Sequence, residues 1–314
     1  MQSSAPKASI VTAAYNQAWK PGFPKASIVI ASYNNKAVLE KALDAMLALD
    51  YPSDYEIIVV DDGSGDGTIE MLSKKFGKEK KIKVIAYGAN RGVCFARNEG
   101  IRAAQFPIVV NMDHDCIPGK SWLRDIVKPF ANPKIGVASS FGSFGGTSTA
   151  FRRELLVKVH GYDQHYRYYR EDTDLTFKIM ELGFEYKRVK APYIHDHKEI
   201  APKGFNGWMK YMLKRLRYHE NDVLLYKKHP ALAKDFLHVK LGFLIDPRED
   251  FKTVVNLWQG SDKKLKLCSP RGLVLIRNKT PLHAIAIIFL GCLYVIAVKS
   301  FRLWGSIRFR QFLI

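Results

Sequence analysis

The feature that most restricts the fold is a regular alternation of short apolar runs with amphipathic segments over residues 27–112. The apolar runs are continuous, which is typical of strands that are buried on both faces. The segments between them carry apolar residues at helical spacing. This series predicts an α/β fold in which helices cover both faces of a mostly parallel sheet. The expected strands are Ser27–Ala31, Glu56–Val60, Ile82–Ala86 and Ile108–Met112, and the expected helices are Lys36–Leu49, Thr68–Phe76 and Val93–Ala104.

Polar side chains follow three of these strands directly. Parallel sheets bind their ligands beyond the carboxyl ends of the strands, so these positions are candidates for a site. Any one of the three can equally be a turn, because Asp before Gly and Ser is a common turn former. All three together would gather many like charges on one rim, and a divalent cation that holds diphosphate oxygens would neutralise them. The segments are Tyr33-Asn34, Asp61-Asp62-Gly63-Ser64 and Asp113-His114-Asp115.

The ordered motifs resemble those of a family 2 glycosyltransferase. The matching segments are SIVIASYNN, EIIVVDDGSGDGT, NRGVCFARNEGI, the Asp-x-Asp of VVNMDHDCIP, GYDQHYRYYREDTDLTFKIMELGF and APYIHDH, within Lys25–Tyr218. Each motif alone is weakly specific, whereas the ordered set is highly specific. The resemblance implies a GT-A fold, which is a Rossmann-like sheet flanked by helices, and transfer of a sugar from a nucleotide-diphosphate sugar.

The resemblance also implies roles for the residues at the strand ends. Tyr33 would stack on the nucleobase, and Asp62, with Asp61 beside it, would accept a hydrogen bond from the base edge. Arg97 would contact donor phosphates or ribose, and Asp113 would lie near the ribose or sugar. A metal and an arginine would stabilise the charge of the departing nucleoside diphosphate. The metal would be Mn²⁺ or Mg²⁺, and its expected ligand here is Asp115.

A second acidic cluster opens the predicted helix that runs to Leu182. Glu171, Asp172 and Asp174 are also what the N-terminus of a helix favours electrostatically, and this explanation stays open. The resemblance implies instead that Asp172 deprotonates an acceptor hydroxyl, so that in-line attack inverts the anomeric centre. Glu171 would then bind the acceptor or tune Asp172.

Three further segments are candidates for the site. His195-Asp196-His197 follows a predicted strand, Glu185–Val189, and one of the two histidines would complete the metal site. The two would point to opposite sides of an extended chain. Arg217 stands where processive family members carry Gln-x-x-Arg-Trp and would hold the diphosphate. The Gln and Trp are absent here, and a solvated basic helix face is an equal alternative. Gly145-Gly146 suggests a loop close to the acceptor.

The rear of the chain is strongly basic. From Lys198 onward there are 22 Lys and Arg against 8 Asp and Glu, a large share of the formal net charge of +19. Residues 282–298 carry no formal charge, and the segment after them mixes cations with aromatic and aliphatic residues, which is typical of an interfacial helix on anionic lipid. A cytosolic catalytic part followed by a single span would contradict the positive-inside rule, whereas an in-plane anchor would not.

These patterns predict three regions and a cytoplasmic site of action. Residues 1–24 partly echo the first strand, since KASIV at position 7 recurs at position 25. Residues 25–235 would form the glycosyltransferase domain, and residues 236–314 a basic extension with a membrane-associated segment, 282–314. No apolar signal-peptide core precedes them, and four widely spaced cysteines exclude a zinc ribbon or a disulfide scaffold. We expect the protein at the cytoplasmic face of the cell membrane.

The predicted activity is inverting transfer of a sugar to a hydroxyl of a lipid-linked or cell-envelope glycan. A polyprenyl-phosphate glycosyltransferase is the main alternative, because a phosphate acceptor needs no base. A sugar nucleotidyltransferase is a further alternative, but it would need a Gly-rich loop with Lys or Arg where Ala31-Ser32-Tyr33-Asn34 stands. Nucleic acid is not an expected partner, because binding it would leave the acidic rim unexplained.

Overall fold

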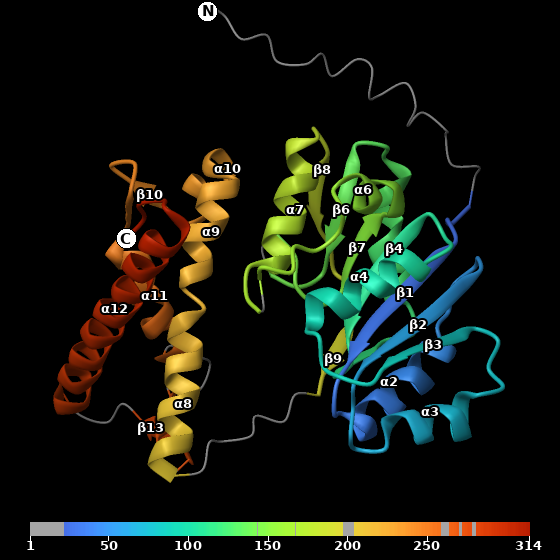
Figure 1. The fold of residues 1–314 in the computed structure, drawn as a ribbon, viewed down its shortest axis with the longest axis horizontal. Helices are drawn as coiled ribbons and strands as arrows, with labels where there is room; N and C mark the ends of the chain where they lie inside the picture. Colours follow the sequence, from blue (N-terminus) through green and yellow to red (C-terminus); the bar gives the residue numbers. More distant parts are fainter. Residues whose placement is uncertain are drawn as a thin grey trace, which may run out of the picture. The chain divides into compact units, whose positions relative to one another are not determined.

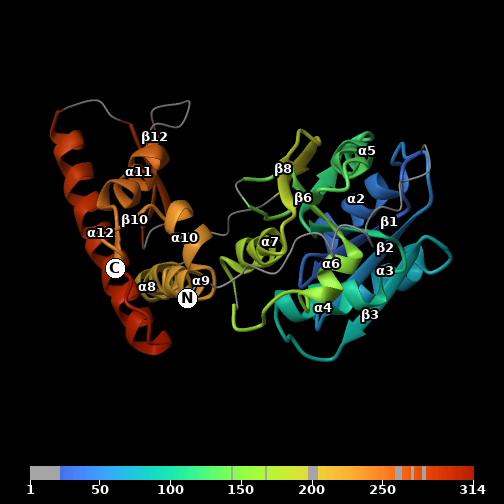
Figure 2. The same cartoon turned by 90° about the horizontal axis from the view of Figure 1, so that it is seen from above.

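The computed structural model divides the chain into two compact units, Met1–His197 and Lys198–Ile314. Figures 1 and 2 show them as the blue-to-yellow and the orange-to-red parts of the ribbon. The predicted domain boundary after residue 235 stays a prediction, and the echo in residues 1–21 and His197 lie outside the described residues. The structure describes residues 22–142, 144–166, 168–196, 204–258, 264–269, 272–277 and 281–314.

A seven-stranded sheet forms the centre of the first unit, in the order β3-β2-β1-β4-β7-β6-β8. Neighbouring strands are parallel except around β7, which runs antiparallel to both β4 and β6. The predicted mostly parallel sheet is confirmed. The strands are β1 Ala26–Ser32, β2 Tyr55–Asp62, β3 Ile82–Tyr87, β4 Ile108–Asp113, β6 Ile135–Ser139, β7 Thr149–Arg152 and β8 Glu185–Arg188.

Helices cover both faces of this sheet, which explains why its central strands are mainly apolar. Ile28 and Ile30 of β1 belong to the main hydrophobic core together with Leu39 and Leu43 of α2. The opposite face of β1 receives α4, and a Cβ on Gly100 would lie 2.2 Å from a methyl carbon of Val29. The helices of this unit are α2 Lys36–Leu47, α3 Thr68–Phe76, α4 Val93–Ala103, α5 Trp122–Val127, the 3₁₀ helix η1 Lys128–Ala131, α6 Arg153–Lys158 and α7 Glu171–Glu181.

The predicted helices and strands of residues 27–112 are all present, and their ends agree with the prediction to within two residues. Helix α2 ends at Leu47 rather than Leu49, and strands β2 and β4 extend into Asp62 and Asp113. Two short strands, β5 Cys116–Pro118 and β9 Tyr193–His195, form a separate antiparallel sheet that the sequence did not predict. It joins the second Asp of the Asp-x-Asp motif to the histidine segment.

The second unit is mainly helical. Its long helix α12, Pro281–Phe309, packs on α9, α11 and α8. The apolar segment and much of the cationic segment predicted after it are therefore one continuous helix. The other elements are α8 Gly204–Arg217, α9 Glu220–Lys228, α10 Pro230–Phe236, β10 Val239–Lys240, β11 Leu244–Ile245, α11 Pro247–Trp258, β12 Lys264–Ser269 and β13 Gly272–Arg277.

One cation of the C-terminal segment is buried inside this unit. Arg302 of α12 is 3% exposed and forms ion pairs of 2.8 Å with Asp222 of α9 and with Asp250 of α11. Lys299 adds a second cation, 3.3 Å from Asp250. No local sequence pattern indicates that Arg302 is buried, because its acidic partners lie far away along the chain.

Candidate active site

The strand register brings the predicted acids to one edge of the sheet. Ser32 at the end of β1 pairs with Asp61 of β2, and Ala31 pairs with Asp113 of β4. The carboxyl ends of three parallel strands therefore stop at the same level. Tyr33, one residue beyond β1, is 45% exposed at this edge.

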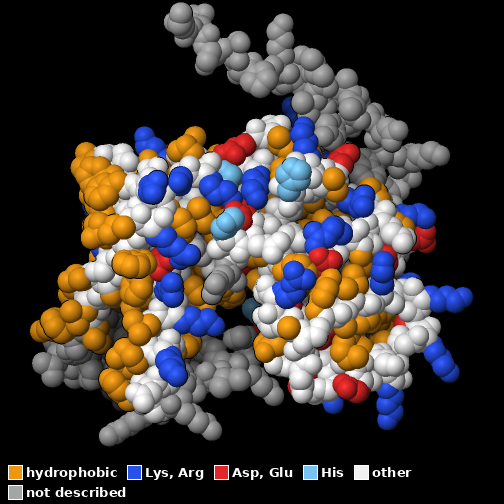
Figure 3. Space-filling model, viewed as in Figure 1, with side chains coloured by type: hydrophobic (Ala, Val, Ile, Leu, Met, Phe, Trp, Pro, Cys, Tyr) orange, Lys and Arg blue, Asp and Glu red, His pale blue; other side chains and the backbone are white. Residues whose placement is uncertain are grey.

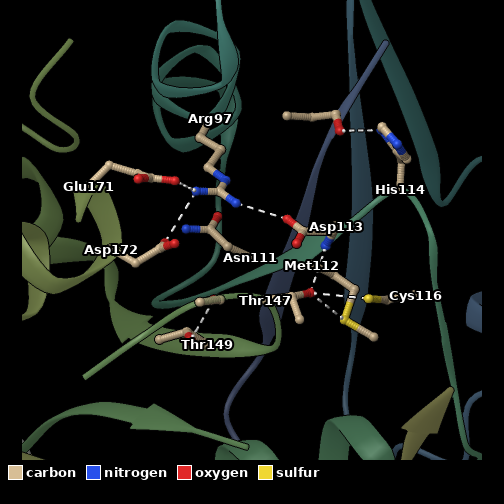
Figure 4. A network of polar contacts seen from close by, with 12 residues as sticks. Arg97, Asn111, Met112, Asp113, His114, Cys116, Thr147, Thr149, Glu171 and Asp172 are labelled. Atoms are coloured by element: carbon tan, nitrogen blue, oxygen red, sulfur yellow. Dashed lines mark hydrogen bonds and ion pairs between the residues drawn. The ribbon is translucent and has the colours of Figure 1, made fainter. Parts of the chain in front are cut away.

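Arg97 of α4 is the centre of the charge network at this edge. Its guanidinium lies 2.8 Å from Asp113, 3.2 Å from Asp172 and 3.6 Å from Glu171 (Figure 4). The arginine side chain is 7% exposed, so these interactions are poorly screened by water. Burial alone would lower the pKa of Arg97, but the surrounding carboxylates outweigh it and raise that pKa. One cation thus faces three acids, and the cluster keeps an excess of negative charge.

This excess charge is reflected in the two acids that open α7. Burial raises the pKa of Glu171 to about 7, and the charge of Asp172 adds to the shift. Burial likewise raises the pKa of Asp172, against the opposing effect of Arg97. Within the part of the chain that the structure describes, Oε2 of Glu171 is buried without a hydrogen-bond partner. These carboxyl groups are therefore better proton acceptors than acids on the surface.

Backbone geometry fixes where Asp172 stands. Arg170, before the first residue of α7, has a left-handed conformation with φ of 77°. Gly145 has φ of 114°, and a Cβ there would come within 2.8 Å of the Asp172 Cβ. The predicted Gly145-Gly146 loop thus approaches the acidic pair itself, and a side chain at 145 would displace it.

Tyr162 is a site residue that the sequence did not single out. Its hydroxyl donates to Oδ1 of Asp172 at 3.0 Å and accepts from the side-chain amide of Asn111 at 2.7 Å. Asn98 holds the Tyr162 backbone from both sides, through its N–H and its carbonyl. The residue stands in the quoted GYDQH segment, but a lone Tyr after Gly gives no local signal of such a contact.

The two adjacent acids of β2 have different surroundings. Both oxygens of Asp62 accept backbone N–H groups, from Arg91 and Gly92, each at 2.8 Å. One oxygen of Asp61 accepts from Ser64 N–H at 3.0 Å, whereas its Oδ1 is buried without a partner among the described residues. Asp62 therefore holds the loop before α4, and Asp61 keeps an open acceptor.

Asp115 and His195, two of the residues predicted to bind metal, lie close together at the β5–β9 pair. Nε2 of His195 lies 3.2 Å from Oδ2 of Asp115, and ligand atoms of these two residues and Cys116 all lie within 4.8 Å of one another. A carboxylate oxygen with an imidazole nitrogen suits Mn²⁺ or Mg²⁺ completed by phosphate oxygens. The donor set therefore fits such an ion, and Asp115 and His195 are the residues that would hold it.

Arg217, another predicted site residue, belongs to the second unit. It lies at the end of α8 in the second unit, with a side chain that is 65% exposed. Its Nε is 3.1 Å from Glu220. Its predicted contact with diphosphate stays a prediction.

With this geometry established, the family model for glycosyl transferase family 2 matches residues 27–187. The chain belongs to this family. The matched range contains the sheet and the acids around Arg97, and it ends before the His195 segment. Membership agrees with the resemblance carried by the strand-end motifs.

Relatives within the family match different lengths of this chain. Glycosyltransferase AglE of Haloferax volcanii is 31% identical over 153 residues, which are 47% of this chain and 44% of that protein. A poly-beta-1,6-N-acetyl-D-glucosamine synthase of Staphylococcus aureus is 31% identical over 234 residues, 63% of this chain and 53% of that protein. The chain spans about half or less of the length of these curated relatives.

A solved structure extends the likeness of the fold. The mannosyltransferase PcManGT of Pyrobaculum calidifontis, in complex with GDP-Man and Mn²⁺, aligns with a TM-score of 0.60 at 20% identity. The alignment covers 95% of this chain and 98% of that one. The predicted GT-A fold is thereby confirmed.

Proposed function

We propose that this chain transfers a sugar from a nucleotide-diphosphate sugar to an acceptor hydroxyl, with inversion at the anomeric carbon. The observation that carries the proposal is the environment of Asp172. Its Oδ1 is engaged by Tyr162 and Arg97, whereas its Oδ2 has no hydrogen-bond partner among the described residues. An acid held by one oxygen, with its pKa raised by burial and its second oxygen free, is arranged to accept a proton.

The donor would bind along the strand ends beside this acid. Tyr33 is exposed for stacking on a base, and the open Oδ1 of Asp61 would accept from the base edge, with Asp62 shaping the loop. Arg97 and Asp113 would contact the ribose, the phosphates or the sugar. Negative charge develops on the departing diphosphate, and the Arg97 guanidinium is the buried cation that would stabilise it.

Metal binding belongs to the same proposal. Asp115 and His195 would hold Mn²⁺ or Mg²⁺, with His197 as the alternative histidine outside the described residues. When bound, such an ion supplies Lewis-acid stabilisation of diphosphate oxygens. The protein's own contribution is to fix the two ligands on paired strands, where their positions are set by the backbone.

We further propose that transfer takes place at the cytoplasmic face of the cell membrane, on a lipid-linked or cell-envelope glycan. The second unit supports this location through its basic composition and α12, which contains a stretch, Ile288–Phe309, long and apolar enough to cross a membrane. Arg217 would hold the diphosphate of the donor. A hydroxyl acceptor is preferred over a phosphate acceptor because the latter would leave the Asp172 arrangement without a use.

The test follows nucleotide release and sugar transfer by the purified chain in detergent. A panel of UDP-, GDP- and dTDP-sugars is offered with Mn²⁺, Mg²⁺ or EDTA, with lipid-linked glycan acceptors. We expect metal-dependent release from one donor, and a loss of transfer of about 10²–10⁴-fold in Asp172→Asn. The matched variant Asp44→Asn, on the exposed side of α2, should keep its activity. Full activity of Asp172→Asn would contradict a hydroxyl acceptor, and failure to bind any nucleotide diphosphate would contradict the function.

A further inference from the structure

The long helix α12 has two faces of opposite character. Residues on one face are buried against the rest of the second unit, among them Gly291, Val298 and Arg302. The other face is apolar and open to solvent. Among residues whose side chains are described, nine large apolar side chains of α12 are at least 42% exposed: Ile285, Ile288, Phe289, Leu290, Leu293, Ile296, Leu303, Trp304 and Ile307.

These side chains form one continuous strip, which we call the α12 strip. Ile285, Phe289, Ile296 and Ile307 are separated by 4, 7 and 11 residues, which are close to whole helical turns, so they lie on one side of the helix. From Ile285 to Ile307 the strip is about 33 Å long at 1.5 Å per residue. Figure 3 shows apolar side chains gathered along the side of the molecule where α12 lies. A contiguous exposed apolar surface formed by nine large side chains marks an interaction surface.

The buried face decides how such a helix can meet a bilayer. Arg302 is clamped between Asp222 and Asp250 from two other helices, and Gly305 lies against the backbone of Glu220, where a Cβ would be 3.0 Å from its Cα. If the candidate span Ile288–Phe309 crossed the hydrocarbon core, Arg302 would enter lipid, and its ionic partners would either be pulled in with it or be left unpaired; both are costly. The contacts are instead compatible with a helix that lies along the surface of a bilayer.

The charge around the strip specifies the lipid. The acids nearest α12, namely Glu220, Asp222 and Asp250, are at most 6% exposed and are paired with arginines. The exposed charges at the C-terminal end of α12 are cationic, with Arg308, Arg310 and Lys227 close in sequence or contact. Trp304 adds a side chain that favours the polar–apolar boundary of a membrane. Cations beside an apolar strip fit an anionic lipid surface.

We infer that the α12 strip docks in the plane of an anionic bilayer, without spanning it, and holds the second unit on the membrane. The inference deepens the membrane location within the proposed function. Docking would bury the strip to the depth of the acyl boundary, while the Arg302 network stays in the protein interior. It also removes the conflict between a spanning helix and the positive-inside rule.

Binding is tested by co-sedimentation of the full chain with vesicles. Vesicles of phosphatidylcholine with one quarter phosphatidylglycerol should retain the protein better than phosphatidylcholine alone, and high salt should weaken this difference. The double variant Ile296→Glu and Ile307→Glu should bind about tenfold more weakly or worse. Val157→Glu, at an apolar position of the first unit that is 56% exposed, is the control and should bind normally. Unchanged binding of the double variant, or self-association without vesicle binding, would overturn the inference.

In-plane docking is distinguished from spanning in cells. A C-terminal epitope tag should resist protease added to intact spheroplasts, and alkaline carbonate should release the membrane-bound chain. A tag that is cleaved from outside, on a chain that resists carbonate, would overturn the in-plane arrangement. Neither assay uses donor or acceptor, so a failure here leaves the transfer chemistry untouched, and an inactive enzyme leaves the docking result valid.

Discussion

Each unit of this protein buries an arginine among carboxylates, and the two networks differ in charge balance. In the first unit Arg97 faces three acids, Asp113, Glu171 and Asp172, at 2.8 to 3.6 Å. In the second unit Arg302, with Lys299 beside it, faces two acids, Asp222 and Asp250. The first cluster is therefore left negative, whereas the second is neutral.

The two networks also differ in how completely their hydrogen bonds are formed, and this indicates different roles. Arg302 donates to Asp222 through two nitrogens and to both oxygens of Asp250, and these bonds join three helices. The Arg97 cluster contains a buried carboxylate oxygen that has no hydrogen-bond partner among the described residues, and it contains acids with raised pKa values. A satisfied network holds a fold together, whereas an unsatisfied one is suited to receive a proton or a charged ligand. The following predictions test this comparison.

The largest expected effect is on stability, from Arg302→Met. Removing one partner of a buried ion pair leaves charge uncompensated, and we expect the second unit to lose about 3–5 kcal/mol. Arg308→Met is the matched control, because that side chain is 53% exposed and its partner Glu220 keeps an ion pair with Arg217, so its loss should cost about 1 kcal/mol or less. Proteolysis in a urea series measures both. Equal effects of the two variants would show that burial of the Arg302 network does not matter.

Replacing the buried arginine of the first unit by Met should lower the rate of sugar transfer. Arg97→Met removes the buried cation beside the proposed diphosphate site, and we expect transfer to fall by about 10²–10³-fold. The fold should persist, because the remaining acids can take up protons. Transfer rates and circular dichroism are measured side by side. If Arg97→Met instead keeps its transfer activity but loses stability as Arg302→Met does, the two networks have the same role and the comparison is contradicted.

Substitution of a glycine tests how tightly the unbalanced cluster is packed. In Gly145→Ala the new methyl group meets Asp172 at a backbone conformation that L-residues avoid, which should cost about 1–3 kcal/mol in strain or misplace the acid. We expect transfer to decline by about tenfold or more in consequence. Gly142→Ala is the matched control, since no atom of the described, non-adjacent residues lies within 4 Å of its Cβ position. If both variants behave alike, Gly145 does not support Asp172.

Glu171 should make the first unit less stable as pH rises. Its pKa is raised to about 7 from an ordinary 4.5, so the folded state holds more protons than the unfolded state between these values. Stability contributed by this group is therefore full below about pH 4.5 and declines up to pH 7. Glu171→Gln should remove that decline and be more stable than the parent at pH 8 by roughly 1–3 kcal/mol. Urea unfolding at pH 5 and pH 8 measures this, with exposed Glu70→Gln as control.

The smallest effect is expected from Tyr162→Phe. The hydroxyl stabilises ionised Asp172, so its loss should raise the pKa of that acid. The acidic limb of the pH profile of kcat/KM should then shift to higher pH by about one unit or less. The ring contact with Arg97 is kept in this variant. Tyr186→Phe loses a hydroxyl bonded to Gly142 instead and should leave the limb unmoved. An unchanged pH profile in Tyr162→Phe would exclude a positioning role for the hydroxyl.

Much of the first unit could be predicted from sequence because its signals are local. Apolar runs such as Ile28–Ile30 and helical spacing in α2 repeat within one element, and their period indicates burial. The acids of the site stand at the ends of those elements, so a parallel sheet was sufficient to bring Asp61 and Asp113 to one edge. The antiparallel strand β7 was not anticipated, since no local pattern indicates strand direction.

Only the tertiary structure decided which polar groups meet. Arg302 and its partner Asp222 are 80 positions apart, and Arg97 and Asp172 are 75 apart. Contacts at such separations depend on how loops close and how helices pack, which no short sequence pattern records. For this reason the sequence predicted that Asp172 is an acid at the start of a helix, but not that Tyr162 holds it. Likewise it predicted a basic apolar tail, and packing determined that Arg302 faces the interior while the apolar side chains face outward.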